Sequence, residues 1–187
     1  MILAKINTEE LNVLTNLFGK LNIHEDEGPK HFVTGILDIY NHALSEEDAE
    51  KFLSSFNDHN LRYEGAYLDF IKELFILNNS HVTIFSPKLD ELFKSEDVSF
   101  LDEKQLELLE RAISLGSEVI KTTSQEVLTL FLILSTREIH FSNFFFLETE
   151  SIVVGNYDLS FPVYCRNHIH FNLIENIARK IGLFLRK

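Results

Sequence analysis

The stretch EIHFSNFFFLETESIVVGNYDLSFPVYC, residues 138–165, decides the expected fold. It contains three short segments rich in aromatic and β-branched residues, which favour strands, separated by residues typical of turns. The segments are 138–147, 151–154 and 159–165. They predict a three-stranded antiparallel β-meander with Pro162 at an edge or a bulge, because proline cannot donate a ladder hydrogen bond. His168–Phe171 can extend the meander, and Asn172 can cap a terminal helix.

The residues before the meander predict helices with recognisable start signals. Asn7 and Glu10 have the spacing of a capping box, and Gly19 suits the end of that helix. Ser45 suits the N-cap of a later helix, whose first-turn acids complement the helix dipole. Apolar periodicity predicts four further helices. One follows Pro29 and runs to Leu44, and the others cover 61–77, 86–94 and 102–121.

The segment Val127–Leu134, VLTLFLIL, is apolar on nearly every side. Periodicity cannot distinguish a buried helix from a buried strand here. Its leucines and the capping-box spacing of Thr123 and Glu126 favour a helix.

Together these segments predict an α+β fold in which helices cover a small sheet, because a three-stranded sheet must bury one face. We expect a mainly helical single domain over residues 1–187, with about six to eight helices. The helical part covers 1–135, the β-meander 136–171 and the C-terminal helix 172–187, while Ile2–Ile6 can add a short strand.

The composition limits the possible partners and compartments. With 29 Asp and Glu against 17 Lys and Arg, the formal net charge is −12, which disfavours binding to nucleic acid or to anionic lipid. The single cysteine excludes an intrachain disulfide, and no apolar run approaches the roughly 20 residues of a membrane span. We therefore expect a cytoplasmic protein that binds neither nucleic acid nor membrane, and the sequence does not predict its oligomeric state.

The tightest set of possible metal ligands or catalytic groups is Cys165, His168 and His170, with His140 on a neighbouring expected strand. Imidazole and thiolate are zinc ligands, and a cysteine beside a histidine can act as a nucleophile. The spacing matches no zinc pattern, and no motif for phosphate, nucleotide or calcium binding is present. The favoured interpretation is therefore no metal, no cofactor and no catalytic residue, with a small metal- or Cys/His-dependent enzyme as the alternative.

The acidic runs are the strongest candidates for a partner-binding surface. In size, acidity and lack of catalytic motifs the chain resembles the small immunity proteins that bacteria pair with toxin domains. This resemblance implies a non-catalytic inhibitor that binds a basic protein, such as a nuclease toxin, by direct contact. A structural or regulatory interaction module is a further alternative. The expected contact residues are Glu25, Asp26, Glu27, Glu46, Glu47, Asp48 and Glu50.

Overall fold

The protein is built on one eight-stranded sheet in which all paired strands are antiparallel. The computed structural model describes residues 3–22, 31–53, 55, 57–92 and 98–187. The strand order is β1-β4-β3-β5-β6-β7-β2-β8, so segments distant in sequence lie side by side. The strands are β1 Leu3–Lys5, β2 Val33–Asp38, β3 Val82–Phe85, β4 Val119–Thr122, β5 Asn143–Phe146, β6 Ser151–Val154, β7 Phe161–Cys165 and β8 Phe184–Arg186.

The expected mainly helical domain with a three-stranded meander is therefore wrong. The three expected strands exist as β5, β6 and β7, but they form the centre of a much larger sheet. Strands β2 and β4 lie where the periodicity predicted helical residues, within the helix expected to end at Leu44 and the one expected over 102–121. The expected short strand at the N-terminus is present as β1 and pairs with β4.

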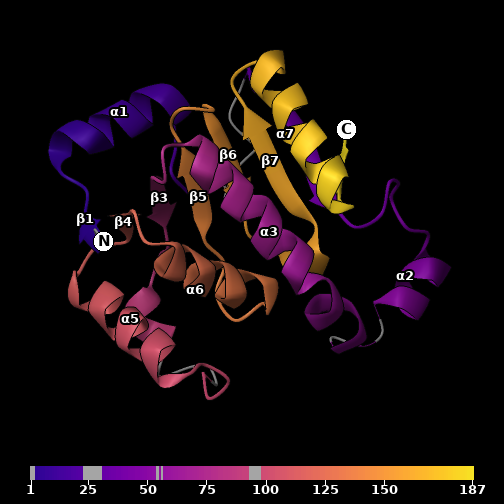
Figure 1. Ribbon diagram of the computed structural model, residues 1–187, viewed down its shortest axis with the longest axis horizontal. Coiled ribbons are helices and arrows are strands. Elements are labelled where there is room, and N and C mark those ends of the chain that lie inside the picture. The colour runs from indigo at the N-terminus through magenta and orange to yellow at the C-terminus, as the bar shows by residue number, and fades with distance from the viewer. Residues whose placement is uncertain (1–2, 23–30, 54, 56, 93–97) are drawn as a thin grey trace.

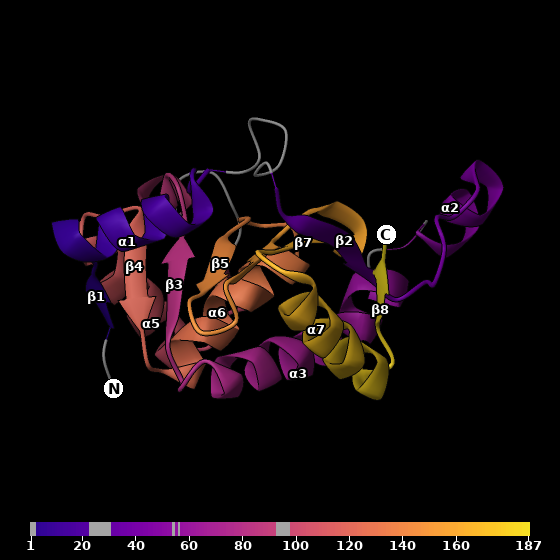
Figure 2. The same cartoon turned by 90° about the horizontal axis from the view of Figure 1, so that it is seen from above.

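Helices cover the two faces of the sheet unequally (Figures 1 and 2). Helix α1 lies on one face, and α3, α5, α6 and α7 pack around the main core on the other. Helix α2 lies apart, at the end of the molecule opposite α1. The helices are α1 Thr8–Phe18, α2 Glu46–Phe52, α3 Arg62–Leu77, α5 Glu103–Ser114, α6 Gln125–Thr136 and α7 His168–Ile181, and shorter turns are η1 Asn57–Leu61, η2 Leu89–Glu91 and η3 Tyr157–Leu159.

Strand β5 is covered on both faces, which explains its consecutive phenylalanines. Side chains alternate between faces along a strand. Phe144 and Phe146 therefore enter the main core, whereas Phe145 enters the smaller core beneath α1, and all three are fully buried. On α1 the matching apolar residues are Leu14 and Phe18. A strand covered on both faces loses the apolar–polar alternation of a half-exposed strand.

Several helix boundaries follow the expected capping chemistry. Asn7 and Glu10 form the predicted capping box, and α1 ends at Gly19, whose φ is +81°. Helix α7, however, is capped by Asn167 and not by Asn172. The terminal helix therefore begins at His168, and His168–Phe171 does not extend the meander, because the chain leaves the sheet at β7 and turns directly into α7.

The apolar segment Val127–Leu134 is helical, as its leucines and its cap favoured. It belongs to α6, whose N-cap is Ser124, not the expected Thr123. The helix is buried between α3, α5 and the sheet, which explains why it is apolar on nearly every side. Among the described residues, no helix combines the length and apolar character needed to cross a membrane.

Candidate functional site

Helix α2 carries those predicted contact residues that the structure describes. The Ser45 hydroxyl accepts a hydrogen bond from the backbone N–H of Asp48 at 3.1 Å and so caps the helix. Glu46 and Glu47 share this first turn, where a carboxylate is favoured by the helix dipole. Glu46, Glu47 and Glu50 are exposed, and no ion pair engages them within the described ranges. Their carboxylates are thus available to an external partner.

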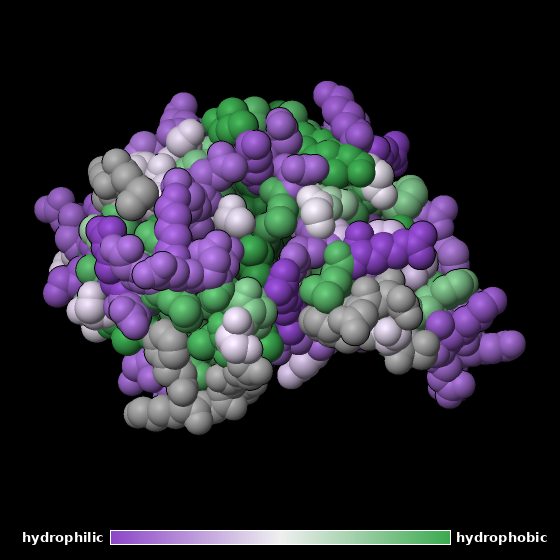
Figure 3. Space-filling model, turned by 60° about the horizontal axis from the view of Figure 1, so that its bottom comes forward, coloured by the Kyte–Doolittle hydropathy of each residue, from purple (hydrophilic) through white to green (hydrophobic). Residues whose placement is uncertain are grey.

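Four of the seven predicted contact residues lie within the described part of the chain. Glu46, Glu47, Asp48 and Glu50 lie together on α2, whereas Glu25, Asp26 and Glu27 fall outside the described residues. The α2 helix buries none of its residues, in contrast to the other α-helices described. Figure 3 shows hydrophilic side chains projecting at the right-hand margin, on the side where α2 lies in Figure 1.

An aromatic cluster lies at the base of α2. The Tyr40 ring centroid is 5.9 Å from that of Phe52 and 6.1 Å from that of His59, which in turn lies 5.8 Å from Tyr63. Phe52 is 42% exposed, so the cluster presents an apolar surface next to the acidic helix. Burial raises the pKa of Tyr40, which keeps its phenol neutral. We call these four residues the aromatic cluster.

His59 differs from the rest of the cluster in being almost fully buried. Its Nδ1 lies 3.1 Å from the side-chain oxygen of Asn60, and its Nε2 has no hydrogen-bond partner among the described residues. The Asn60 amide also donates to the backbone oxygen of Thr136 at 2.9 Å. The cluster is therefore held against the end of α6 rather than on a free loop.

A bidentate ion pair strengthens the same attachment. Arg137 donates through two nitrogens to the Glu64 carboxylate, each at 2.9 Å, and this bonding raises the pKa of Arg137. The Thr136 hydroxyl also donates to Glu64 at 3.0 Å. Bidentate arginine–carboxylate pairs fix geometry as well as charge. The start of α3, and with it Tyr63, is thus held against the end of α6.

The four Cys and His residues considered for an enzyme are not brought together. Cys165 points into the main core from β7, and burial raises the pKa of its thiol to about 12. His168 and His170 lie in the first turn of α7 and not on a strand, so their expected common side is wrong. In the part of the chain that the structure describes, no group of three or more possible ligands surrounds a metal position.

His140 instead joins a buried serine network that the sequence spacing did not reveal. Its Nε2 lies 2.8 Å from the hydroxyl of Ser86, which also accepts a hydrogen bond from the Ser142 hydroxyl at 3.1 Å. Ser135 donates to the backbone oxygen of His140 at 3.2 Å. The network ties the turn after α6 to the end of β3. A serine beside a histidine is a nucleophile arrangement, yet Ser86 is only 2% exposed, and a structural role fits better.

Acidification is expected to destabilise the protein through His140. Burial lowers the pKa of His140 in the folded protein, whereas the unfolded residue has a pKa of about 6.5. The unfolded chain therefore binds the proton more readily, so the free energy of unfolding falls as the pH drops below about 6.5. Urea unfolding at several pH values should show a shallower acid decline for His140→Gln than for the wild type. Equal declines would contradict this role, because all other titrating groups are shared.

The α2 surface and the aromatic cluster together form the candidate functional site. It combines exposed carboxylates and an exposed phenylalanine on α2 with two half-buried tyrosines, Tyr40 and Tyr63. Comparisons with models of protein families, with curated proteins and with solved structures each found no match to this chain. The function must therefore be inferred from the geometry and charge of the site.

Proposed function

We propose that this chain is a non-catalytic binding protein of the cytoplasm that neutralises a basic protein partner by direct contact. The partner contacts α2 and the aromatic cluster at its base. An inhibitor of immunity type, directed against a basic nuclease toxin, is the form that best fits this chemistry. The single observation that carries the proposal is the juxtaposition of free carboxylates on α2 with the exposed ring of Phe52.

This juxtaposition supplies the two components of a protein interface. Aromatic residues are enriched among the residues that dominate binding energy, and they work best when polar groups surround them. Carboxylates around such an anchor attract a basic surface and accelerate its association. The chain's formal net charge of −12 also attracts a basic partner, at longer range.

Local cations do not cancel this acidic surface. Lys51 lies 5.3 Å from the ring centroid of Phe52, and Arg62 lies 5.3 Å from that of Tyr63. Both cations therefore contact rings of the aromatic cluster, and within the described residues Glu46 and Glu47 form no ion pair. The helix thus presents carboxylates from its first turn to Glu50, close to the exposed ring of Phe52.

Charge reversal on α2 is expected to slow association with the partner about tenfold or more at low salt. The first partner to test is the product of the adjacent reading frame, if that product is a basic domain of nuclease size. A biosensor should measure rate constants for the wild type and for Glu47→Lys/Glu50→Lys at low and high salt. Inhibition of nuclease activity by equimolar chain provides the functional measurement.

The matched control is Glu107→Lys/Glu110→Lys, on the exposed face of α5. It has the same spacing on a helix and the same change in net charge. We expect the α5 variant to bind nearly as fast as the wild type, whereas Phe52→Ala should mainly accelerate dissociation. Equal slowing by both charge reversals would show that only net charge matters. No effect from either would exclude α2 as the contact surface.

A further inference from the structure

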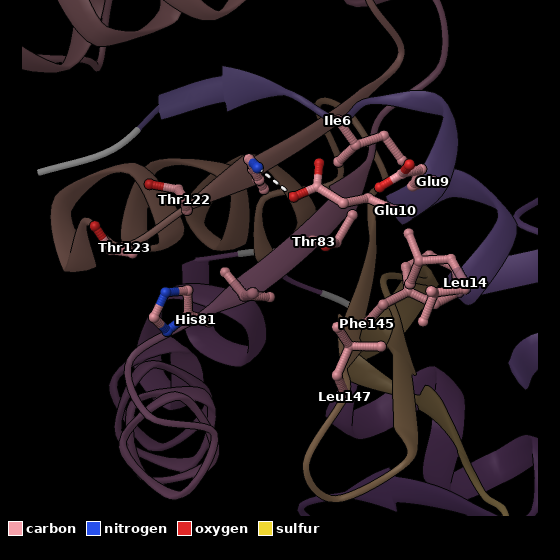
Figure 4. Close-up of a pocket in the computed structure, with 13 residues that line it drawn as sticks. Ile6, Glu9, Glu10, Leu14, His81, Thr83, Thr122, Thr123, Phe145 and Leu147 are labelled. Carbon is pink, nitrogen blue, oxygen red and sulfur yellow. Dashed lines mark hydrogen bonds and ion pairs between the residues drawn. The ribbon is translucent and has the colours of Figure 1, made fainter.

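A cavity of about 510 Å³ lies at the end of the sheet opposite α2, between α1 and the strands β4, β3 and β5 (Figure 4). Cavities of this volume are typical of small-molecule sites. Figure 4 shows Thr122, Thr123 and His81 on one side of the cavity and Glu10 and Leu14 on the other. None of its lining residues belongs to α2 or to the aromatic cluster. It is therefore a separate site, beyond the function proposed above.

The register of the sheet builds the floor of the cavity. Lys121 on β4 is paired with Thr83 on β3, and Thr83 is paired with Phe145 on β5. Residues directly opposite in neighbouring strands point to the same face of a sheet. A cation, a hydroxyl and an aromatic ring thus follow one another across three strands.

The walls of the cavity are mostly apolar. Leu14 and Phe145 are buried at the contact of α1 with the sheet. Val13 and Leu147, which also line the cavity, are 54% and 42% exposed. Exposed apolar side chains that border a cavity provide a surface for the apolar part of a ligand.

Thr83 supplies an unpaired polar group inside the cavity. The residue is only 7% exposed, and its hydroxyl makes no hydrogen bond to any residue that the structure describes. A hydroxyl that no described protein group engages can bond to a ligand group in place of water. The hydroxyl can either donate or accept.

The charges at the cavity leave one carboxylate unbalanced. Lys121 donates to Glu10, the pair drawn with a dashed line in Figure 4, and this bond lowers the pKa of Glu10. Glu9 also lines the cavity, is exposed and forms no ion pair within the described part of the chain. With Glu10 neutralised by Lys121, the residual charge is negative and favours a cation.

We propose that this cavity binds a small organic cation, a primary amine carried on an apolar chain or ring. The apolar part lies against Val13, Leu14, Phe145 and Leu147. The ammonium group donates to the Glu9 carboxylate at the mouth and to the hydroxyl of Thr83. The protein's acidic surface raises the local concentration of such a cation.

Calorimetric titration with n-octylamine, 1-octanol and octanoate tests the charge preference, since the three share one chain and differ in the head group. We expect octylamine to bind with one-to-one stoichiometry and about tenfold more tightly than either of the others. Tighter binding of octanoate, or equal binding of all three, would overturn the proposal. No measurable binding of octylamine would overturn it as well.

Variants on α1 separate binding in the cavity from adsorption to an acidic surface. Val13→Trp places a large ring at the mouth of the cavity from an exposed position and should abolish octylamine binding. Asn16→Trp, exposed on the same helix but outside the lining, should leave it unchanged. Octylamine binding that survives Val13→Trp would identify adsorption and refute the site.

Two further variants complete the design. Leu147→Trp blocks the cavity from another exposed lining position and provides a second test if circular dichroism shows that Val13→Trp alters the fold. Thr83→Val keeps the shape and removes the hydroxyl, so it should weaken octylamine more than octanol by several-fold. Equal weakening of both ligands would remove the assigned role of Thr83.

Discussion

Replacing Gly35 with valine is expected to lower the free energy of unfolding by about 3 kcal/mol or more. Gly35 lies in β2, between β7 and β8. A Cβ atom at this position would lie 2.8 Å from the backbone oxygen of Arg186 and 3.0 Å from both Leu185 and Phe171 side-chain atoms. Because the closest atom belongs to the backbone, the clash cannot be relieved by a change of rotamer.

The consequence extends beyond one strand. Moving the Arg186 carbonyl away from Gly35 disrupts the pairing of β8 with β2, and moving Phe171 disturbs the packing of α7 on the sheet. Natural domains are stable by only about 5–15 kcal/mol, so a loss of this size is a large share of the total.

Denaturant unfolding of Gly35→Val and Gly65→Ala measures the effect against a matched glycine. Gly65 lies inside α3, and a Cβ there meets no atom within 4 Å. Alanine should therefore stabilise the helix by about 0.5–1 kcal/mol, because it reduces the entropy of the unfolded chain. If Gly35→Val unfolds at the wild-type denaturant concentration, β8 does not approach β2 as closely as described.

Local chemistry in the sequence predicted the helices better than the sheet. The capping box of Asn7 and Glu10 acts within one turn and so is visible without tertiary structure. Strand β2 was missed because Val33, Ile36 and Leu37 also fit a helical face. Leu37 is buried in the main core, while Ile36, on the other face, is 39% exposed. Only the neighbouring strands β7 and β8 decide between the two periodicities.

The helix expected over 102–121 ends earlier than predicted, and the reason is related. Helix α5 stops at Ser114, and Gly116 takes a positive φ of 58° before β4 begins. Strand β4 is only four residues long, too short for its alternation to stand out in the sequence. Its partners β1 and β3 come from distant parts of the chain, so no local sequence pattern predicts the pairing.

The candidate site was predictable only in its acidic half. Glu46, Glu47 and Asp48 form a visible run behind a capping serine. The aromatic cluster combines residues from three separate segments, and no spacing in the sequence connects Tyr40 with Tyr63. The cavity between α1 and the sheet likewise depends on the register of three strands, which tertiary structure alone defines.

Removing the carboxylate of Asp38 is expected to cost about 3–5 kcal/mol, because it leaves a buried guanidinium without its counter-charge. Asp38 ends β2 and receives a hydrogen bond from Arg186 on β8, and the two side chains are 5% and 17% exposed. The Nε of Arg186 already lacks a partner among the described residues, so its charge has few other contacts. The Ser160 hydroxyl also donates to Asp38, at 3.1 Å.

Asp38 also connects the sheet to the candidate site. Its Oδ1 accepts a hydrogen bond from the backbone N–H of Tyr40 at 2.9 Å, which fixes the turn that presents the Tyr40 ring to Phe52. Asp38→Ala should therefore weaken partner binding as well as the fold. Weaker stability with unchanged affinity would show that the aromatic cluster does not depend on this turn.

A double-mutant cycle distinguishes the ion pair from the size of the side chains. Arg186→Met keeps most of the volume and leaves Asp38 unpaired, so it should also destabilise the protein. The double variant Asp38→Ala/Arg186→Met buries no unpaired charge and should lose clearly less than the sum of the single losses. Additive losses, measured by urea unfolding, would mean that the pair contributes no coupling. In that case β8 is held on β2 by its backbone hydrogen bonds and by Leu185 alone.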